Sequence, residues 1–234
     1  IAEAFSKLGA QTILVDKDEI ALKESVTKLG VGHKYFPIDV THSDAANQAM
    51  LATINIFGGL DILISNAGAA HAGPMLDISN EELRNAFELN FFSHYSFSTE
   101  AAKILKDQNR GGQILFNISK QAVNPGKNFG AYGLPKATTF FLMRQLALEL
   151  GSDGIRVNGI NADRIRSGLL TDDFISSRAK SRGVSESEYM AGNLLNKEVT
   201  AEHVADAFTA LACAESTTGH VMTVDGGNIE ASLR

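Results

Sequence analysis

The fold is decided by the stretch Leu60-Asp61-Ile62-Leu63-Ile64-Ser65-Asn66-Ala67-Gly68. A short apolar run that ends in a small polar turn is typical of a strand that is buried on both faces. Strands of this kind belong to parallel sheets, because the helices that connect parallel strands cover both faces. Ligands bind at the carboxyl ends of such strands, so we expect Asn66, Ala67 and Gly68 to lie at a binding site.

Helix and strand patterns alternate on both sides of this stretch. Apolar residues recur at helical spacing from Ile1 until Gly9 ends the pattern, and Ser79 with Glu82 forms a capping box before a longer helix. Besides the strand at 60–65, strands are predicted at 12–15, 35–38, 114–118, 155–160 and 220–224. Helices are predicted near 1–8, 22–29, 46–54, 79–101, 132–150 and 201–212.

This alternation predicts one α/β domain over residues 1–234, a Rossmann-like, doubly wound parallel sheet with helices on both faces. The opening helix needs a strand before it, so we expect a further strand and a Gly-rich phosphate-binding turn ahead of Ile1. Between Asp163 and Thr200 the pattern changes to short polar helices, in a stretch too long for an ordinary connection. We expect a substrate-binding loop there.

Composition argues against several classes of function. The formal net charge is −6 and Lys and Arg form no dense cluster, so nucleic acid is not expected as a partner. The apolar runs are far shorter than the roughly 20 residues that span a bilayer, so no membrane partner is expected. Cys213 is the only cysteine, which excludes an internal disulfide and fits the reducing cytoplasm; we expect it to be buried. The His residues show no zinc-binding spacing, and no metal is predicted.

Residues that directly follow the predicted strands are the candidates for chemistry, because the carboxyl ends of parallel strands meet at one edge of the sheet. In chain order they are Asp16, Asp39, Val40, Asn66, Ala67, Gly68 and Ser119.

Tyr132 and Lys136 lie one helical turn apart at the start of the next helix, and therefore on one face of it. The pKa of a Tyr hydroxyl is ordinarily near ~10, and a neighbouring ammonium favours the phenolate, so the pair predicts a general acid/base. Taken alone, this spacing also fits an exposed Tyr on a helix surface. Ser119, at the end of a strand, and Asn90, in the preceding long helix, favour the catalytic interpretation.

The chain resembles the short-chain dehydrogenase/reductases in the order and spacing of Asn66-Ala67-Gly68, Asn90, Ser119 and Tyr132-x-x-x-Lys136. The resemblance implies that Tyr132 is the catalytic acid/base, that Ser119 holds the substrate oxygen, and that Lys136 binds the nicotinamide ribose while lowering the pKa of Tyr132. It implies further that Asn90 positions a water in the proton relay. The implied cofactor contacts are Asp39 and Val40 for the adenine, Asn66, Ala67 and Gly68 along the sheet edge, and Ile165 and Ser167 for the carboxamide.

Two departures from the family pattern lie near these residues. Asp163 stands where the family usually has Gly, which leaves the local backbone shape open, and Lys120 is an unusual residue directly after Ser119. The stretches 116–120, 161–170 and 226–228 are most similar to the dehydrogenase part of bifunctional aldolase/short-chain dehydrogenase proteins. This similarity implies a sugar-derived alcohol or a hydroxyaldehyde such as lactaldehyde as substrate, and an aldolase domain ahead of Ile1.

Two other functions remain open at this point. A non-catalytic dinucleotide-binding regulatory protein would share the fold, although binding alone needs no proton relay. A sugar-nucleotide epimerase or dehydratase would share the Tyr-x-x-x-Lys spacing, although the residues after Lys136 leave little room for a sugar-nucleotide domain.

Asp16 predicts NAD as the cofactor. A carboxylate at this place accepts hydrogen bonds from the adenosine ribose hydroxyls, whereas it would repel the 2′-phosphate of NADP. The ammonium of Lys17 would offset part of that repulsion. The alternative is that Asp16 only starts a turn before Asp18.

The helices near 88–104 and 132–150 carry more apolar surface than one buried face needs, including Phe91, Phe92, Phe140 and Phe141. Members of the resembled family pair these helices across a twofold axis, so a homodimer or homotetramer is expected.

Overall fold

The structure is a computed structural model that describes residues 1–70 and 72–228. Its strands are β1 (Ile13–Asp16), β2 (Lys34–Pro37), β3 (Ile62–Ser65), β4 (Gly112–Asn117), β5 (Ile155–Ala162) and β6 (Val221–Val224). Its α-helices are α1 (Ala2–Lys7), α2 (Glu19–Leu29), α3 (Ala45–Phe57), α4 (Asn80–Phe87), α5 (Ser93–Gln108), α6 (Gly130–Leu150), α7 (Asp172–Arg182), α8 (Glu186–Met190) and α9 (Ala201–Cys213).

The predicted parallel α/β architecture is confirmed, but the sheet is interrupted. β1 pairs only with β2, and the other strands form a second parallel sheet in the order β3-β4-β5-β6. A cavity of about 1040 Å³ lies between β1 and β3 and is lined by residues of both strands.

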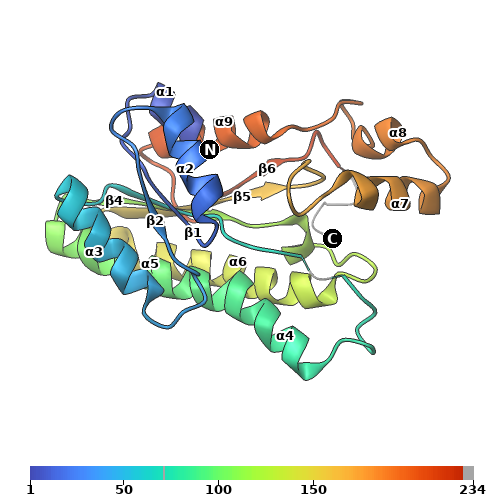
Figure 1. Ribbon diagram of the computed structural model, residues 1–234, viewed down its shortest axis with the longest axis horizontal. Coiled ribbons are helices and arrows are strands. Elements are labelled where there is room, and N and C mark those ends of the chain that lie inside the picture. The colour runs from blue at the N-terminus through green and yellow to red at the C-terminus, as the bar shows by residue number, and fades with distance from the viewer. Residues whose placement is uncertain (71, 229–234) are drawn as a thin grey trace.

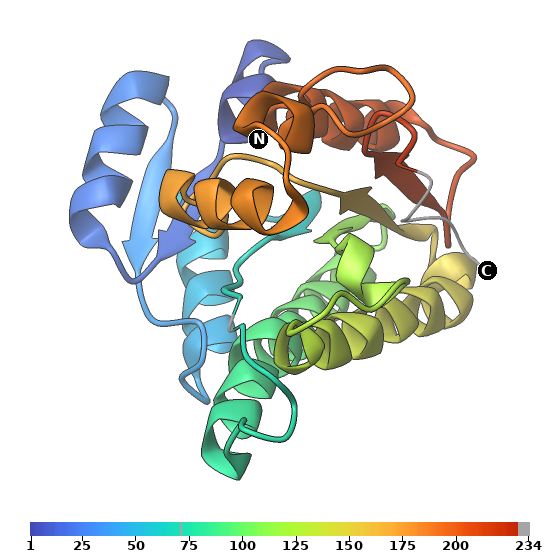
Figure 2. The ribbon, with the colours of Figure 1, turned by 90° about the vertical axis from the view of Figure 1, so that its right-hand side faces the viewer.

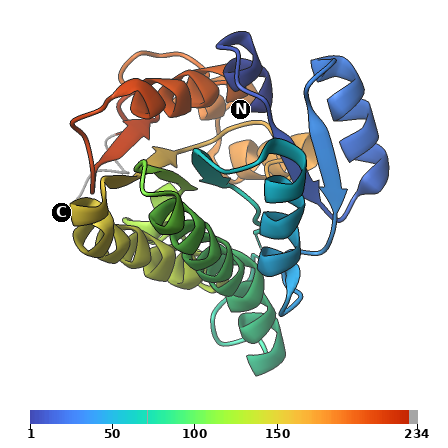
Figure 3. The ribbon, with the colours of Figure 1, turned by 90° about the vertical axis from the view of Figure 1, so that its left-hand side faces the viewer.

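Helices cover both faces of the sheets (Figure 1). α1, α2 and α9 lie on one face, and α3, α5 and α6 lie on the other. Figure 2 looks at the side of the molecule that carries α7 and α8, and β2 with α2 forms one margin of the domain in this view. From the opposite side, Figure 3 shows α3, α5 and α6 packed together beneath the strands.

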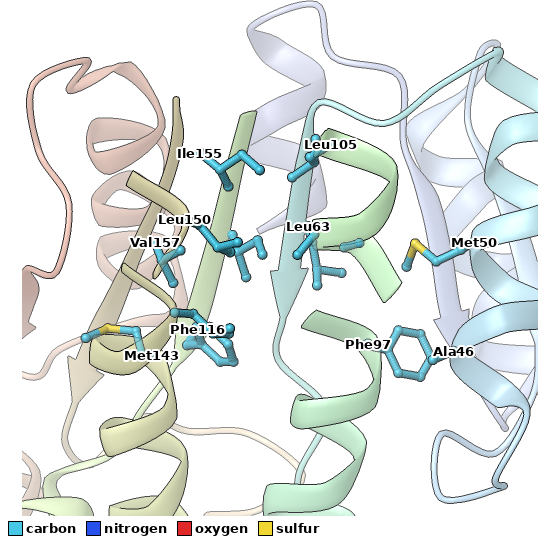
Figure 4. Close-up of a cluster of buried hydrophobic side chains, with 14 of the residues drawn as sticks. Ala46, Met50, Leu63, Phe97, Leu105, Phe116, Met143, Leu150, Ile155 and Val157 are labelled. Carbon is cyan, nitrogen blue, oxygen red and sulfur yellow. The ribbon is translucent and has the colours of Figure 1, made fainter. Parts of the chain in front are cut away.

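Each face of the larger sheet has its own apolar cluster. On one face, Ala46 and Met50 of α3 face Phe97 of α5, while Met143 of α6 lies beside Phe116 of β4 (Figure 4). On the other face, a second cluster contains Phe5, Leu115, Ile160, Val204, Ala207, Phe208 and Leu211. β4 is therefore buried on both sides, as its continuous apolar sequence predicts.

The long helix predicted from Ser79 is present but is divided. The capping box of Ser79 and Glu82 starts α4, and a turn of π-helix over Glu88–Phe92 separates α4 from α5. A π-turn inside an α-helix is uncommon and frequently occurs at functional sites. Here it contains Asn90, one of the residues singled out from the sequence.

The polar stretch after β5 forms a small lobe of its own. Thr171 caps α7, Ser185 caps α8, and the two helices pack through a separate cluster of Ile175, Ala179, Tyr189 and Met190. Among the described residues, the helices lack the combination of length and apolar character needed to cross a membrane. Cys213 is exposed at the end of α9, so the expectation that it is buried is wrong.

Candidate active site

Ser119 and Tyr132 meet just beyond the carboxyl end of β4. Ser119 starts a short 3-10 turn, and its Oγ accepts a hydrogen bond from the backbone N–H of Gln121 at 3.2 Å. α6 packs against this turn, and the Tyr132 and Ser119 side chains share a hydrogen bond. Gly133 allows the close approach, because a Cβ at this position would lie 3.0 Å from the backbone oxygen of Gln121.

Lys136 lies one turn farther along α6, on the same face as Tyr132. Its Nζ is 5.9 Å from the centroid of the Tyr132 ring and donates a hydrogen bond to the backbone oxygen of Asn117 at 3.1 Å. Only 2% of Lys136 is exposed, and this burial lowers its pKa to about 8. The ammonium is therefore an internal charge that belongs to the site.

Tyr132 is 7% exposed, and its burial raises the pKa of the hydroxyl above the ordinary value of 10. The hydrogen bond with Ser119 acts in the opposite direction and is the smaller effect. The lowering of this pKa by Lys136, which the resemblance implies, stays a prediction; in this structure the loss of water penalises the phenolate more than the Ser119 hydrogen bond stabilises it. Near neutral pH Tyr132 is thus a neutral phenol that can donate a proton.

Asn90 is held in place by its amide and by its backbone. Its Nδ2 donates to the backbone oxygens of Ala69 and Ala86, at 2.9 and 3.1 Å, and its own backbone oxygen accepts a hydrogen bond from Thr139 Oγ1 at 2.7 Å. Its Oδ1 is buried and has no hydrogen-bond partner among residues 1–70 and 72–228. A buried, unpaired carbonyl oxygen is a natural place for an ordered water.

Gly68 connects Asn90 to Lys136. A Cβ on Gly68 would lie 2.9 Å from Asn90 Oδ1 and 3.5 Å from Lys136 Nζ, so a larger residue would press on both groups. Asn66 joins the same cluster, since its Oδ1 accepts a hydrogen bond from Asn117 Nδ2 at 2.8 Å. The structure therefore brings the predicted residues Asn66, Gly68, Asn90, Ser119, Tyr132 and Lys136 into one contiguous group.

The predicted cofactor residues of β1 and β2 lie at the other side of the cavity. Asp16, Val40, Asn66 and Ala67 all line the cavity between β1 and β3. One oxygen of Asp16, Oδ1, accepts a hydrogen bond from the backbone N–H of Asp18 at 3.0 Å, so the turn considered as an alternative does form. The second oxygen has no hydrogen-bond partner among the described residues.

Asp39 is anchored by Thr41. The backbone N–H and the hydroxyl of Thr41 donate to Asp39 Oδ1 at 3.0 and 2.8 Å, and these hydrogen bonds lower the pKa of Asp39. Lys17 Nζ lies 3.7 Å from Asp39 Oδ2. The ammonium next to Asp16 is thus directed toward a carboxylate.

Ile165 and Ser167 lie in the loop after β5. Ile165 is half-buried against the cluster beneath α9. Ser167 is exposed, and its hydroxyl donates to the backbone oxygen of Ile165 at 3.2 Å. Both residues are near the loop's start, but no described contact joins them to Tyr132 or Lys136.

The two departures from the family pattern lie against each other. Lys120 Nζ is 3.5 Å from Asp163 Oδ2, and both side chains are largely buried. Asp163 also accepts a hydrogen bond from Asn228, and Arg164 Nε is 3.5 Å from Asp163 Oδ2. The left-handed backbone position is at Arg164, with φ of 56°, and not at Asp163. The unusual Lys therefore faces a carboxylate beside the site.

Sequence reasoning missed three residues of the site. Asn117 and Thr139 hold Lys136 and Asn90 through hydrogen bonds that join distant segments. The third is His94, whose ring lies beside Lys136; the absence of zinc-binding spacing among the His residues gave no role to it. A signal for His94 was present, because it follows Asn90 by four residues, about one helical turn.

The residues present fit a nicotinamide dinucleotide in the part of the site that the structure describes. The free oxygen of Asp16 suits a ribose hydroxyl, Val40 offers an apolar wall, and the Lys136 ammonium offers a donor at the opposite end. Within the described part of the chain, His, Cys, Asp and Glu form no group of three suited to a metal ion.

Comparison with known proteins gives one family model that spans nearly the whole chain. The model described as enoyl-(acyl carrier protein) reductase matches residues 1–228. A curated relative, the uncharacterized oxidoreductase YuxG of Bacillus subtilis, is 34% identical over 198 residues. This match covers 81% of the chain but only 29% of YuxG, so the chain spans less than a third of that relative.

Two further matches extend over most of both chains. The 7alpha-hydroxysteroid dehydrogenase of Escherichia coli is 29% identical over 98% of this chain and 89% of its own. The crystal structure of 3-ketoacyl-(acyl-carrier-protein) reductase from Brucella melitensis complexed with NADH has a TM-score of 0.85 and 24% identity. It is matched over 97% of this chain and 91% of its own, and it establishes the likeness of fold.

Proposed function

Because this chain belongs to the short-chain dehydrogenase/reductase family, a family of oxidoreductases that use nicotinamide dinucleotides, we propose that it transfers hydride between NAD and a small hydroxyl or carbonyl substrate. The observation that carries the proposal is the buried cluster in which Ser119, Tyr132 and Lys136 lie together at the end of β4. A protein that only binds a dinucleotide has no use for a proton donor in this place.

A nicotinamide dinucleotide, when bound beside Tyr132, would supply or accept the hydride. In carbonyl reduction, Tyr132 donates its phenolic proton to the substrate oxygen, and its neutral form near pH 7 suits that step. The Ser119 hydroxyl, already fixed by Gln121, orients the same oxygen. Lys136 stabilises the phenolate left on Tyr132, and Asn90 Oδ1 holds the water through which Tyr132 regains a proton. In alcohol oxidation the proton moves in the opposite direction.

We propose that the chain prefers NAD to NADP as its cofactor, and the residue behind this proposal is Asp16. One of its carboxylate oxygens is used by the turn, and the other is available for a ribose hydroxyl. Lys17, the cation that would soften repulsion of a 2′-phosphate, points toward Asp39. No Arg adjoins Asp16 in sequence to form a planar phosphate clamp.

For the substrate, we propose a small sugar-derived alcohol or hydroxyaldehyde such as lactaldehyde, bound under the loop at 163–200. The support is the similarity of stretches 116–120, 161–170 and 226–228 to aldolase-linked dehydrogenases, together with the ionic pair of Lys120 and Asp163 beside Ser119. An aldolase domain in the natural polypeptide is proposed on the same similarity, although the relatives named above carry no mention of an aldolase. A cytoplasmic location is proposed from the single cysteine, Cys213, which fits a reducing compartment.

The experiment is a turnover screen of the full-length natural protein with NAD and with NADP. Small alcohols and hydroxyaldehydes are offered, and formation of reduced cofactor is followed by absorbance. We expect NAD-dependent turnover with at least one hydroxyaldehyde. Tight NAD binding without turnover would favour the regulatory alternative, and conversion of a sugar nucleotide without net cofactor reduction would favour an epimerase.

A homodimer or homotetramer is proposed from the outer face of α5 and α6. Phe92, the last residue of the π-turn before α5, and Phe141 of α6 are 46% and 69% exposed, whereas Phe91 and Phe140 are half-buried within the protomer. Leu148, on the same helix as Phe141, is 80% exposed. Light scattering at micromolar concentration should give at least twice the protomer mass, and Phe141→Ser should weaken the assembly more than Leu51→Ser on α3. A monomeric natural protein would contradict the proposal.

A further inference from the structure

A buried histidine lies directly behind the Lys136 ammonium. His94 of α5 is 1% exposed, and its Nε2 is 3.4 Å from Lys136 Nζ. Its other ring nitrogen, Nδ1, is 2.6 Å from the Oγ of Ser65 at the end of β3. The ring also lies against Phe116 of β4, with ring centroids 6.1 Å apart. Three separate elements therefore hold the imidazole in one orientation.

Lys136 depends on this neighbour, because it has no carboxylate partner among the described residues. An ammonium offers three N–H donors and no acceptor. One donor goes to the backbone oxygen of Asn117, at 3.1 Å, and a second faces His94 Nε2. A buried charge without such acceptors is costly, and the remaining donor is left for the site.

We propose that His94, oriented by Ser65, is a positioning residue that accepts a hydrogen bond from Lys136 and so keeps the ammonium charged and directed toward Tyr132. The inference rests on the proposed function and adds a residue to it. Because the ammonium has only hydrogens to offer, Nε2 presents its lone pair, and Nδ1 carries the hydrogen that it donates to Ser65 Oγ.

The neutral imidazole that this role requires fits its surroundings. Burial holds the pKa of His94 well below its ordinary value of 6.5, and the charge of Lys136 lowers it further. A hydrogen bond with the Ala67 backbone acts in the opposite direction and is the smallest of the three effects. The titratable group that contacts it from α6 is Lys136. β3, β4 and the turn after β3 contribute the neutral residues Ser65, Phe116 and Ala67 to the surroundings of the imidazole.

The test measures the titration of Lys136 directly in the full-length protein. Lysine labelled with carbon-13 at Cε is followed by NMR against pH, and the signal of Lys136 is identified by its loss in Lys136→Met. We expect a wild-type midpoint near 8. His94→Leu should lower the midpoint by about one pH unit, the size expected for one lost hydrogen bond to a buried charge.

Two variants separate positioning from packing. His94→Gln can place Oε1 near the former Nε2 and should restore the midpoint to within about 0.3 unit, because an acceptor is regained. Ser65→Ala should give an intermediate decrease. His33 is the control: it is also buried, at 7% exposure, and it is bonded to the hydroxyls of Ser6 and Thr12 and not to Lys136. His33→Leu should leave the Lys136 midpoint unchanged.

An unchanged Lys136 midpoint in folded His94→Leu would overturn the inference. If His94→Leu does not fold, an unchanged Lys136 midpoint in Ser65→Ala would overturn the inference instead. The basic limb of the kcat/KM profile should move together with the NMR midpoint. Absence of any turnover in the wild-type protein would remove the proposed function but would leave the titration result standing, so the two failures are distinguishable.

Discussion

The catalytic cluster and the carboxylates at the ends of β1 and β2 are held in opposite ways. Lys136 and Tyr132 are buried, and their polar atoms bond to residues that are distant in sequence, such as Asn117 and Ser119. Asp16 and Asp39 are instead held mainly by residues two positions onward, Asp18 and Thr41, and they lie toward solvent.

This difference fits the two roles that the proposed function gives to these residues. Acid/base chemistry needs fixed geometry and a shifted environment, which only a packed interior supplies. Recognition of a ribose hydroxyl needs a correctly placed acceptor, and a local turn at the end of a strand supplies that. Variants of the buried cluster and variants of the two carboxylates should therefore differ in which property they change, as well as in the size of the change.

The largest effect is expected for Tyr132→Phe. The ring and its packing remain, but the transferable proton is lost, so kcat should fall at least about 100-fold while NAD affinity changes little. Steady-state kinetics and equilibrium binding of the cofactor measure the two quantities. Tyr35→Phe, at a half-buried position of β2, is the control variant and should keep the wild-type kcat. More than about a tenth of wild-type turnover in Tyr132→Phe would remove this Tyr from the mechanism.

Core variants should reveal the same contrast in stability. Phe116 is fully buried on β4, and Phe116→Ala should lower the free energy of unfolding by about 3–5 kcal/mol. Val15, on β1, is only half-buried, and Val15→Ala should cost about 1 kcal/mol. Chemical denaturation of both variants decides the point. Equal decreases in the free energy of unfolding for the two variants would contradict this contrast between the sheets.

A smaller effect is expected at the cofactor edge. Wild-type kcat/KM should favour NAD over NADP at least about tenfold, equivalent to roughly 1.4 kcal/mol, and Asp16→Ala should narrow the ratio. Asp18→Ala is the matched control, since it removes a neighbouring carboxylate that caps α2 and should leave the ratio unchanged. A wild-type preference for NADP would refute the assignment of Asp16 to the ribose.

The smallest effect is expected for Thr41→Val. The Thr41 hydrogen bonds hold the pKa of Asp39 below its ordinary value, so they stabilise the fold above the unfolded pKa, and this stability is lost as pH falls through the folded pKa. Thr41→Val removes the hydroxyl and keeps the backbone N–H. Its free energy of unfolding should fall by less than about 1 kcal/mol at pH 7, and this decrease should vanish in acid. Thermal unfolding at several pH values measures it. A loss that persists in acid would point to packing.

The sequence by itself determined the order of the elements and the positions of most candidate residues. Strand-like apolar runs, the capping box at Ser79 and the one-turn spacing of Tyr132 and Lys136 are local patterns, and the physics that produces them is local as well. The tendency of polar residues to gather at the ends of parallel strands follows from the topology that those patterns imply.

Only the tertiary structure decided what surrounds these residues. The π-turn at Asn90, the pairing of Lys120 with Asp163, the contact of His94 with Lys136 and the raised pKa of Tyr132 all depend on segments that are far apart in the chain. Burial and hydrogen bonding between such segments are set by how the helices pack on the sheet. The four-residue spacing of Asn90 and His94 places both on one helix face, but it does not show which residue of another segment either one meets.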